Sequence, residues 1–431
     1  MKGLIYTYGM TALGAAASIF YPLVGLMIFI NFAIVQPSSM WYWSVPQYNY
    51  SRILAIAVGI GWLIKGFGNW RLGRSMPVVL ALSGFFLWCC LGYAACDYPP
   101  VAEGFVVSLA KILFPFLVGI TLINDVPKLK VLGWTLALSQ GYVAYEMNLS
   151  YYAGVNRVAT VGFAGMDNNY VAVAMVTGAG LAFFLGLGER RIWLKAIAFL
   201  AAVLMAHTVM FSWSRGGMLG LIVTAVVGFL LVVKKPTHFV FFVLILLVGL
   251  RLAGPQVRQR FSSVFVDPAE RDRSASSRLE SWAACWDVMY KQPVLGVGPN
   301  HWPIRAGAYG HPGVEAHSLW LQTGAELGFP GLIFLLCFYG FCMIRLWPLT
   351  RKKTPVADPW LRDVARMVIA SLVGFGVAGQ FVSISGLELP YYIVLFGAGA
   401  LKLNSMAARP APAPLAAPAR AAPREPEAAA V

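Results

Sequence analysis

The chain has 431 residues, of which 59% are hydrophobic and only 12% charged, and its mean hydropathy is +0.69. A soluble domain carries about 25% charged residues, so no soluble core could bury this much apolar surface and the bilayer must act as part of the solvent. The net charge of +15 would suggest a nucleic-acid partner in a soluble protein, but the distribution of Lys and Arg around membrane spans explains part of it, and we expect no nucleic acid.

Apolar segments long enough to cross, or nearly cross, a bilayer recur along the chain. The first follows Lys2 without a clear cleavage site, so we interpret it as a retained membrane segment, with a break considered near Tyr21 and Pro22. We predict an all-α polytopic membrane protein with about 12 transmembrane helices and one large, partly helical periplasmic loop. The predicted spans are residues 4–35, 53–64, 77–93, 106–123, 131–147, 170–187, 193–211, 218–233, 239–252, 318–344, 364–381 and 390–403.

The loops between these spans alternate in charge. Lys and Arg clusters assign every second loop to the cytoplasm, and the even number of spans then puts both termini there. The domain organisation we predict is transmembrane helices over residues 1–252, a periplasmic loop over 253–316, transmembrane helices over 317–406 and a disordered, proline-punctuated cytoplasmic tail over 407–431. The clusters are Lys65/Arg71/Arg74, Lys128/Lys130, Arg190/Arg191/Lys195, Lys234/Lys235 and Arg351/Lys352/Lys353.

The loop of residues 253–316 is rich in arginine although it lies outside. Long loops cross the membrane largely regardless of charge, so the topology holds, but the arginines need an anionic partner. Residues 277–290 predict an amphipathic helix, because apolar residues recur there at steps of three and four. Cys96 and Cys285 both fall on the outer side, yet nothing in their spacing specifies a disulfide. The loop arginines are Arg258, Arg260, Arg271, Arg273, Arg278 and Arg305, and the apolar positions of the helix are Leu279, Trp282, Ala283, Trp286 and Met289.

The segment 212–217, Ser-Trp-Ser-Arg-Gly-Gly, lies where one span ends on the outer side and the next begins. An arginine at this depth is costly unless it faces a cavity or an anion, and two glycines would let the backbone turn and a ligand approach. Arg215 could equally be an interfacial anchor whose charged head reaches the membrane surface. Residue physics alone leaves the two interpretations about equal.

A second group combines His317, at the outer mouth of a span, with Glu326 in the same segment. Histidine there could act as a base, an acid or a hydrogen-bond donor, although an interfacial structural histidine is the more frequent case. Asp167, Asn168 and Asn169 open another span. They are ordinary N-cap residues, but together with Arg157 they could bind sugar or phosphate.

Several other chemistries have no signature in the sequence. It contains no Walker A motif, no clustered His/Cys metal spacing and no Gly-x-Ser-x-Gly. No Asp-x-Asp occurs in an outer loop, which disfavours a metal-dependent glycosyltransferase. The scarcity of charges inside the spans weakens the hypothesis of a proton-coupled transporter.

Three motifs in order resemble the O-antigen ligase superfamily, which includes lipopolysaccharide O-antigen ligases, O-antigen polymerases and O-linked oligosaccharyltransferases. They cover residues 212–332, and the helical architecture extends the likeness to about residue 403. Ser318 follows His317 where many members have Asn, a small departure. Arg157 followed by Asp167-Asn168-Asn169 is similar to O-glycosylation ligases linked to exosortase systems. The motifs are Ser214-Arg215-Gly216-Gly217; then Ser277-Arg278-Leu279-Glu280-Ser281-Trp282 with Pro293-Val294-Leu295-Gly296-Val297-Gly298-Pro299; then Ala316-His317-Ser318 with Ala325-Glu326-Leu327-Gly328-Phe329-Pro330-Gly331-Leu332.

The resemblance implies a donor glycan carried on undecaprenyl pyrophosphate and a reaction at the periplasmic face of the bacterial inner membrane. It implies that Arg215 and Arg278 stabilise the pyrophosphate and that His317 activates or orients the acceptor hydroxyl. Arginine suits this role because its planar fork holds phosphate oxygens bidentately, so neither metal nor cofactor is needed. Direct displacement would invert the anomeric centre.

The resemblance also implies the partners: the donor, membrane lipid, and a glycan, lipid or protein acceptor. Arg157, Asn168, Asn169, Ser214 and Glu326 are the predicted substrate-binding residues. The leading hypothesis is therefore a ligase that transfers a glycan in lipopolysaccharide or polysaccharide synthesis. A polymerase of the same superfamily, whose acceptor is another lipid-linked repeat, is the close alternative. A transporter or flippase for lipid-linked sugar is the third, and it predicts ionisable residues deep within the spans.

Overall fold

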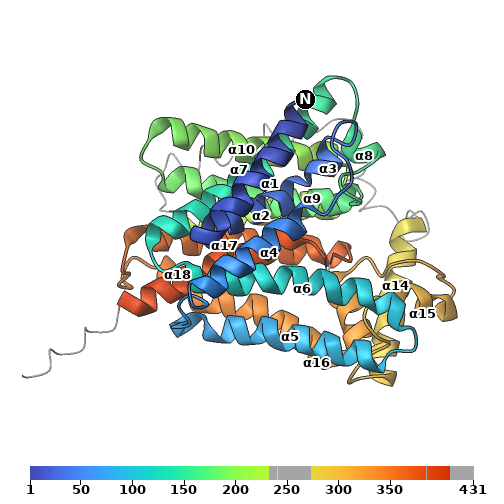
Figure 1. Cartoon of the computed structure of the whole chain (residues 1–431). Coiled ribbons are helices and arrows are strands. Elements are labelled where there is room, and N and C mark those ends of the chain that lie inside the picture. Colours follow the sequence, from blue (N-terminus) through green and yellow to red (C-terminus); the bar gives the residue numbers. More distant parts are fainter. Residues whose placement is uncertain (233–239, 241–272, 385, 408–431) are drawn as a thin grey trace, which may run out of the picture.

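A computed structural model of the chain describes residues 1–232, 240, 273–384 and 386–407 (Figure 1). The predicted span at 239–252, the loop arginines Arg258, Arg260 and Arg271 and the tail from residue 408 onward lie outside the described residues. Apart from a single antiparallel bridge between Phe163 and Met166, the described chain consists of helices and their connections. The all-α prediction is confirmed.

Eight helical segments in the described chain are long and apolar enough to cross a membrane. Two further apolar helices are shorter, and these data do not establish the predicted number of about 12 spans. The eight are α1 (Lys2–Phe20), α2 with α3 (Pro22–Val35, Pro37–Met40), η1 with α5 (Gly73–Ser75, Met76–Ala95), α6 (Pro99–Leu122), α9 (Asn168–Gly188), α10 (Ile192–Phe211), α16 with η4 (Leu319–Leu346, Trp347–Thr350) and α17 with η5 (Pro359–Ala378, Gly379–Phe381). The shorter two are α4 (Tyr50–Ile64) and α11 (Arg215–Leu231).

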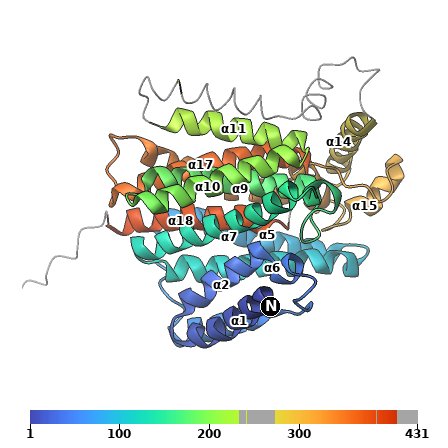
Figure 2. The ribbon, with the colours of Figure 1, turned by 90° about the horizontal axis from the view of Figure 1, so that it is seen from above.

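The helices run roughly parallel to one another in a bundle, with α9 in its interior (Figures 1 and 2). Helix α9 is the most deeply buried of the candidate spans and contacts α7 (Val126–Tyr152), α10, α11, α17 and α18 (Glu388–Ala407). Small residues allow these close approaches, as is usual for packing within membranes. Gly217 of α11 packs on Ala172 of α9, and Gly220 of α11 packs on Ala378 and Gly374 of α17.

The first predicted span is two antiparallel helices, because the chain breaks at Tyr21 and Pro22 starts α2. Proline suits the first turn of a helix, where its missing N–H costs nothing. Gly25 of α2 packs on Ser18 of α1, and Gly3 packs on Trp41. The N-terminus therefore lies at the end of the bundle that carries residues 36–49. The prediction placed these two segments on opposite sides of the membrane, because it counted residues 4–35 as one span.

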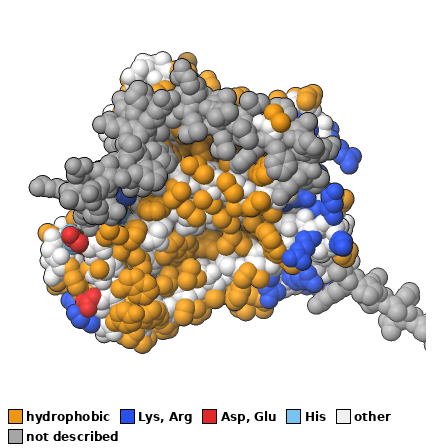
Figure 3. Space-filling view, turned by 180° about the vertical axis from the view of Figure 1, so that it is seen from behind, with side chains coloured by type: hydrophobic (Ala, Val, Ile, Leu, Met, Phe, Trp, Pro, Cys, Tyr) orange, Lys and Arg blue, Asp and Glu red, His pale blue; other side chains and the backbone are white. Residues whose placement is uncertain are grey.

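The surface agrees with a membrane location. One face of the molecule is broadly apolar across its middle, and most Lys and Arg side chains on that face gather at the end where α18 finishes (Figure 3). This is the charge asymmetry expected of a cytoplasmic surface. With the candidate spans, it describes a multi-pass membrane protein.

At the opposite end, α14 (Arg273–Lys291), α15 (Trp302–Arg305) and η3 (Ala306–Tyr309) form a small domain on top of α16 (Figure 1). The helix predicted at 277–290 is confirmed, but its apolar positions do not all face inward. Met289 is buried and Trp282 half-buried, whereas Leu279, Ala283 and Trp286 are exposed. Packing against α16 decides which side of the helix faces inward. The buried positions are Ser281, Ala284, Cys285, Val288 and Met289.

Candidate active site

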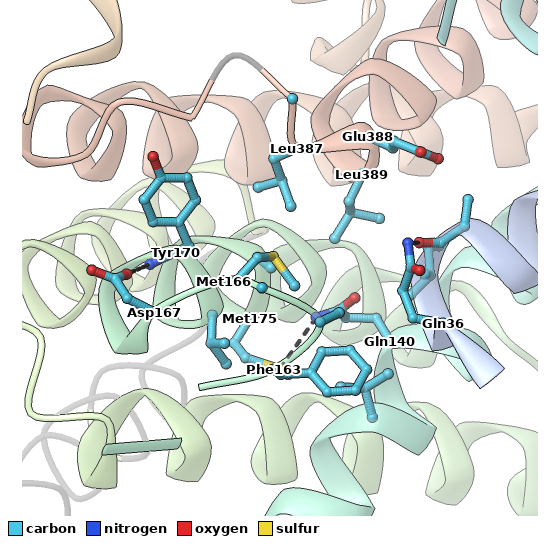
Figure 4. Close-up of a pocket in the computed structure, with 18 of the residues that line it drawn as sticks. Gln36, Gln140, Phe163, Met166, Asp167, Tyr170, Met175, Leu387, Glu388 and Leu389 are labelled. Atoms are coloured by element: carbon cyan, nitrogen blue, oxygen red, sulfur yellow. Dashed lines mark hydrogen bonds between the residues drawn. The ribbon is translucent and has the colours of Figure 1, made fainter. Parts of the chain in front are cut away.

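A cavity of about 670 Å³ opens between the outer ends of α2, α9 and α18, the middle of α7, and the loop that precedes α16 (Figure 4). It falls in the range typical of small-molecule sites, roughly 300–1,000 Å³. His317 and Glu315 line it from the loop, and Asp167 and Tyr170 from the start of α9. The predicted catalytic histidine therefore faces the cavity.

Backbone strain is concentrated around this cavity. Six non-glycine residues in the described chain have a positive φ, and three of them, Gln36, Ala164 and His317, line the cavity. His317 has φ +50°. Left-handed backbone costs a side-chain-bearing residue of the order of 1–3 kcal/mol and persists only where neighbours hold it, most often at functional sites.

The residues next to His317 supply that support. The Ala316 N–H donates to the Gln322 side chain at 3.0 Å, and the Trp282 indole N–H donates to the Ala316 carbonyl at 3.0 Å. Ser318 caps α16 by accepting the Leu321 N–H at 3.3 Å. His317 is therefore clamped from the outer domain on one side and from α16 on the other.

Glu315, two residues before His317, is held by a contact with Tyr170 of α9, which also contacts the segment before α18. The Tyr170 hydroxyl lies 2.7 Å from Glu315 Oε2 and 2.6 Å from the Ser383 carbonyl oxygen. A hydroxyl has one hydrogen, so both contacts are hydrogen bonds only when Glu315 is protonated and donates to Tyr170, which donates to Ser383. Burial raises the pKa of the Glu315 carboxyl and the charge of Asp167 adds to the rise, while the hydrogen bond from Tyr170 opposes it. The geometry thus describes a neutral carboxylic acid beside His317.

His317 lies between charges of opposite sign. Burial lowers the pKa of the imidazole, the positive charge of Arg278 lowers it further, and Asp167 opposes both. Burial and Arg278 thus favour the neutral imidazole, the form able to accept a proton. Arg278 projects from the same helix as Trp282, one turn earlier.

Arg215 is the first residue of α11 and is half-buried. Phe381 connects this helix start to α14, because Gly216 packs on the Phe381 side chain and the Trp282 ring lies 6.3 Å from the Phe381 ring. Gly216 and Gly217 are inside α11 with no positive φ, so the hypothesis that they turn the backbone is wrong. Their missing side chains make room for Phe381 and Ala172.

Glu326 is buried within α16, away from the cavity lining. Its carboxylate accepts the backbone N–H groups of Asn300 at 3.1 Å and Trp302 at 3.2 Å, and the Gln322 amide at 3.1 Å. It therefore anchors the outer domain to the membrane helix. A carboxylate in a span is tolerated here because three donors surround it.

Helix α16 is broken at Gly328, and residues 293–298 of the outer domain pack at this break. Gly328 has φ +68°, and the Ala325 and Glu326 carbonyls accept the N–H groups of Val297 and Gly298 at 3.0 and 2.9 Å. The Phe329 N–H donates to Pro293 at 2.9 Å. The motif around residues 293–299 and the motif around 325–332 are therefore one docking joint, in which each satisfies the backbone groups that the other leaves unpaired.

The remaining predicted residues lie around the start of α9 and do not line the cavity. Arg157, at the start of α8 (Arg157–Thr160), donates to the Ser39 carbonyl at 3.2 Å and lies 5.6 Å from the Tyr42 ring. The Asn168 amide donates to the Ser212 carbonyl at 2.8 Å. Asn169 donates to Asp167 and Asn168, and Ser214 caps α11 by accepting the Gly217 N–H. These contacts hold the outer ends of α8, α9 and α11 together.

Two histidines and two cysteines lie near this end of the molecule. His301 is buried in the loop before α15, with its Nδ1 bonded to the Pro299 carbonyl and its Nε2 accepting the Tyr98 N–H. His311 pairs with Glu280 at 3.4 Å. Cys96 and Cys285 are free thiols, so they form no bridge in the described chain.

Sequence reasoning missed four polar residues of the cavity: Gln36, Gln140, Glu315 and Glu388. Each lies within or beside an apolar span, where a polar side chain is costly. A polar residue at such a position was therefore the signal in the sequence that could have identified them. Gln140 donates to the Met175 sulfur at 3.3 Å, and the Tyr392 hydroxyl donates to Glu388 at 3.0 Å. Among the described residues, no group of three or more His, Cys, Asp or Glu is arranged to hold a metal ion.

The fold and the cavity describe a multi-pass membrane protein with a polar site toward the end of the bundle that carries α14 and α15. Residues 200–336 match the family model described as O-Antigen ligase, so this part of the chain is similar to that family. The match covers Arg215, Arg278, His317 and Glu326, and the family is a family of enzymes acting on lipid-linked glycans in general. A search of curated proteins finds none that matches the chain.

Proposed function

We propose that this protein transfers a glycan from undecaprenyl pyrophosphate to an acceptor hydroxyl at the periplasmic face of the bacterial inner membrane. The observation that carries the proposal is the strained, clamped His317, which lines a cavity and interacts electrostatically with Arg278. The similarity to the O-antigen ligase family supports it, because that family implies lipid-linked glycan substrates.

The proposed reaction is a single displacement. Neutral His317 takes the proton of the acceptor hydroxyl, whose oxygen forms a bond to the anomeric carbon of the donor glycan. The bond from that carbon to the pyrophosphate oxygen breaks, and its electron pair leaves with the pyrophosphate. Because the acceptor attacks opposite the leaving group, the anomeric configuration inverts.

Arg215 and Arg278 hold the pyrophosphate in this proposal. Charge develops on the leaving oxygens in the transition state, and guanidinium groups placed beforehand stabilise it without a metal ion. Glu326 and Ser214 contribute indirectly by fixing the outer domain and the start of α11. Asn168, Asn169 and Arg157 fix the start of α9 and its neighbours. About 12 spans, with the loop 253–316 in the periplasm, complete the proposed arrangement.

The experiment is transfer by the purified protein from a defined lipid-linked glycan to a panel of acceptors, with and without a chelator. The panel contains sugar, lipid and peptide hydroxyls and a second lipid-linked repeat, so that ligase and polymerase activity are separated. His317→Ala should lose transfer by about 10²–10⁴-fold while still binding the lipid-linked donor. His311→Ala is the matched control, because His311 is a half-buried histidine of the same domain. Normal transfer by His317→Ala, or loss of transfer on chelation, would contradict the mechanism.

A further inference from the structure

The cavity that His317 lines carries three acidic side chains and, among the described residues, neither lysine nor arginine. The acidic residues are Asp167, Glu315 and Glu388. Asp167 and Glu388 lie toward its two ends, with Leu387, Leu389 and Met166 between them (Figure 4). Lys111 of α6 interacts with Glu388 but does not line the cavity.

This charge distribution does not suit a pyrophosphate. Like charges placed close together repel one another, so anionic groups avoid a cavity lined by the carboxylates of Asp167 and Glu388. The positive charge near His317 comes from Arg278, on α14, which contributes nothing to the cavity lining. His317 therefore interacts with an arginine that does not line the cavity and with the Asp167 carboxylate, which does.

The walls of the cavity suit an uncharged polyol. Phe163, Met175, Leu387 and Leu389 provide apolar surface, which can cover the faces of a sugar ring. Gln36 and Gln140 provide amides that both donate and accept hydrogen bonds, and the carboxylates accept bonds from hydroxyl or ammonium groups. A mixed lining of apolar surface with a few convergent polar groups is the usual form of a small-molecule site.

We propose that this cavity is the acceptor site, and that it takes an uncharged or amino-bearing sugar and rejects one that carries phosphate or carboxylate. This rests on the proposed function, since in a displacement the acceptor and the leaving pyrophosphate lie on opposite sides of the anomeric carbon. With Arg278 on the pyrophosphate side, the acceptor lies on the cavity side, next to the base. Asp167 and Glu388 then determine which acceptor sugars bind.

The test measures direct binding, so that it does not depend on turnover. His317→Ala protein in lipid nanodiscs is titrated calorimetrically with four glycosides of one scaffold: butyl glucoside, butyl glucosaminide, butyl glucuronide and butyl glucoside 6-phosphate. The neutral and amino glycosides should bind, and the two anionic ones should bind at least about tenfold more weakly. Equal or tighter binding of the anionic glycosides, or no binding by any of the four, would overturn the proposal.

Two sets of variants locate the binding. Ala174→Trp fills the cavity and should abolish glycoside binding, whereas Ala12→Trp, on the exposed face of α1, should not change it. Asp167→Asn and Glu388→Gln keep the side-chain size and should raise the affinity for the anionic glycosides, and Asn caps α9 as well as Asp does. Glycoside binding that persists in Ala174→Trp, or charge variants without effect, would overturn the site.

A third measurement separates this proposal from the proposed function. Undecaprenyl pyrophosphate in the nanodisc should bind Ala174→Trp normally and bind Arg278→Ala at least tenfold more weakly. If Ala174→Trp abolishes that binding instead, the cavity holds the pyrophosphate and the acceptor proposal fails. Failure of transfer from any lipid-linked glycan, with selective glycoside binding intact, would refute the proposed function and leave the cavity as a neutral-sugar site.

Discussion

Replacing Glu326 with alanine should release the outer domain from α16. The carboxylate accepts three hydrogen bonds, from Asn300, Trp302 and Gln322, and the site is buried. Each buried donor left without an acceptor costs about 1–3 kcal/mol, so the substitution should cost about 3 kcal/mol or more. At about 1.4 kcal/mol per factor of ten, the opening equilibrium of the domain should rise by about a hundredfold or more.

Cys285 reports this opening. It is 0% exposed on the buried side of α14, in a cluster with Trp302 and Ala325. In a variant that keeps Cys285 as its single cysteine, a membrane-impermeant maleimide can react only when the domain opens. The rate of labelling should therefore rise about a hundredfold in Glu326→Ala, in step with the opening equilibrium.

Glu280→Ala is the matched control on the same domain. Its side chain is 66% exposed and pairs with His311 at 3.4 Å, so the substitution should change the labelling rate little. The same labelling rate for Glu326→Ala and Glu280→Ala would refute the reasoning, since it would mean that the buried carboxylate does not hold the domain.

Four further predictions follow from other sites. The fold favours the neutral form of Glu315, so the stability that this carboxyl contributes is fully present below its unfolded pKa and is lost as pH rises through its raised folded pKa. Over that pH window, the melting temperature of the wild type should fall relative to that of Glu315→Gln. Melting temperatures that change in parallel from about pH 4 to about pH 8 would contradict this. Gly328→Ala should cost about 1–3 kcal/mol or more, because Gly328 has φ +68° and a side chain would collide with the Val294 carbonyl; thermal unfolding measures it, and Gly340→Ala, in open space on the same helix, should cost nothing. Arg278→Lys should restore transfer poorly because lysine keeps the charge but lacks the fork, and full activity would indicate a simple field effect. Cysteine at Val294, which is 56% exposed, should label in intact cells, whereas cysteine at Lys352 should label only after the cytoplasm is opened; the reverse pattern would invert the topology.

Several features of this protein could be predicted from the sequence because they depend on local pattern. Long apolar runs define membrane helices regardless of their neighbours, and the turn at Tyr21-Pro22 and the helix at 277–290 have local signals. The order of the three motifs also identified the family that residues 200–336 match. Local pattern did not choose between a kink and a full turn at Tyr21, which is why the N-terminus and residues 36–49 were predicted at opposite ends of the bundle.

Tertiary structure decided which polar residues share one cavity. Glu315, Asp167 and Glu388 belong to three separate segments, and only packing of α9, α18 and the loop before α16 brings them near His317. It also decided that Glu326 anchors the outer domain and that the two motifs around 293–299 and 325–332 form one joint. Such contacts are non-local, so no periodicity or spacing encodes them. They depend on which helix faces pack together and on where buried donors and acceptors must find partners.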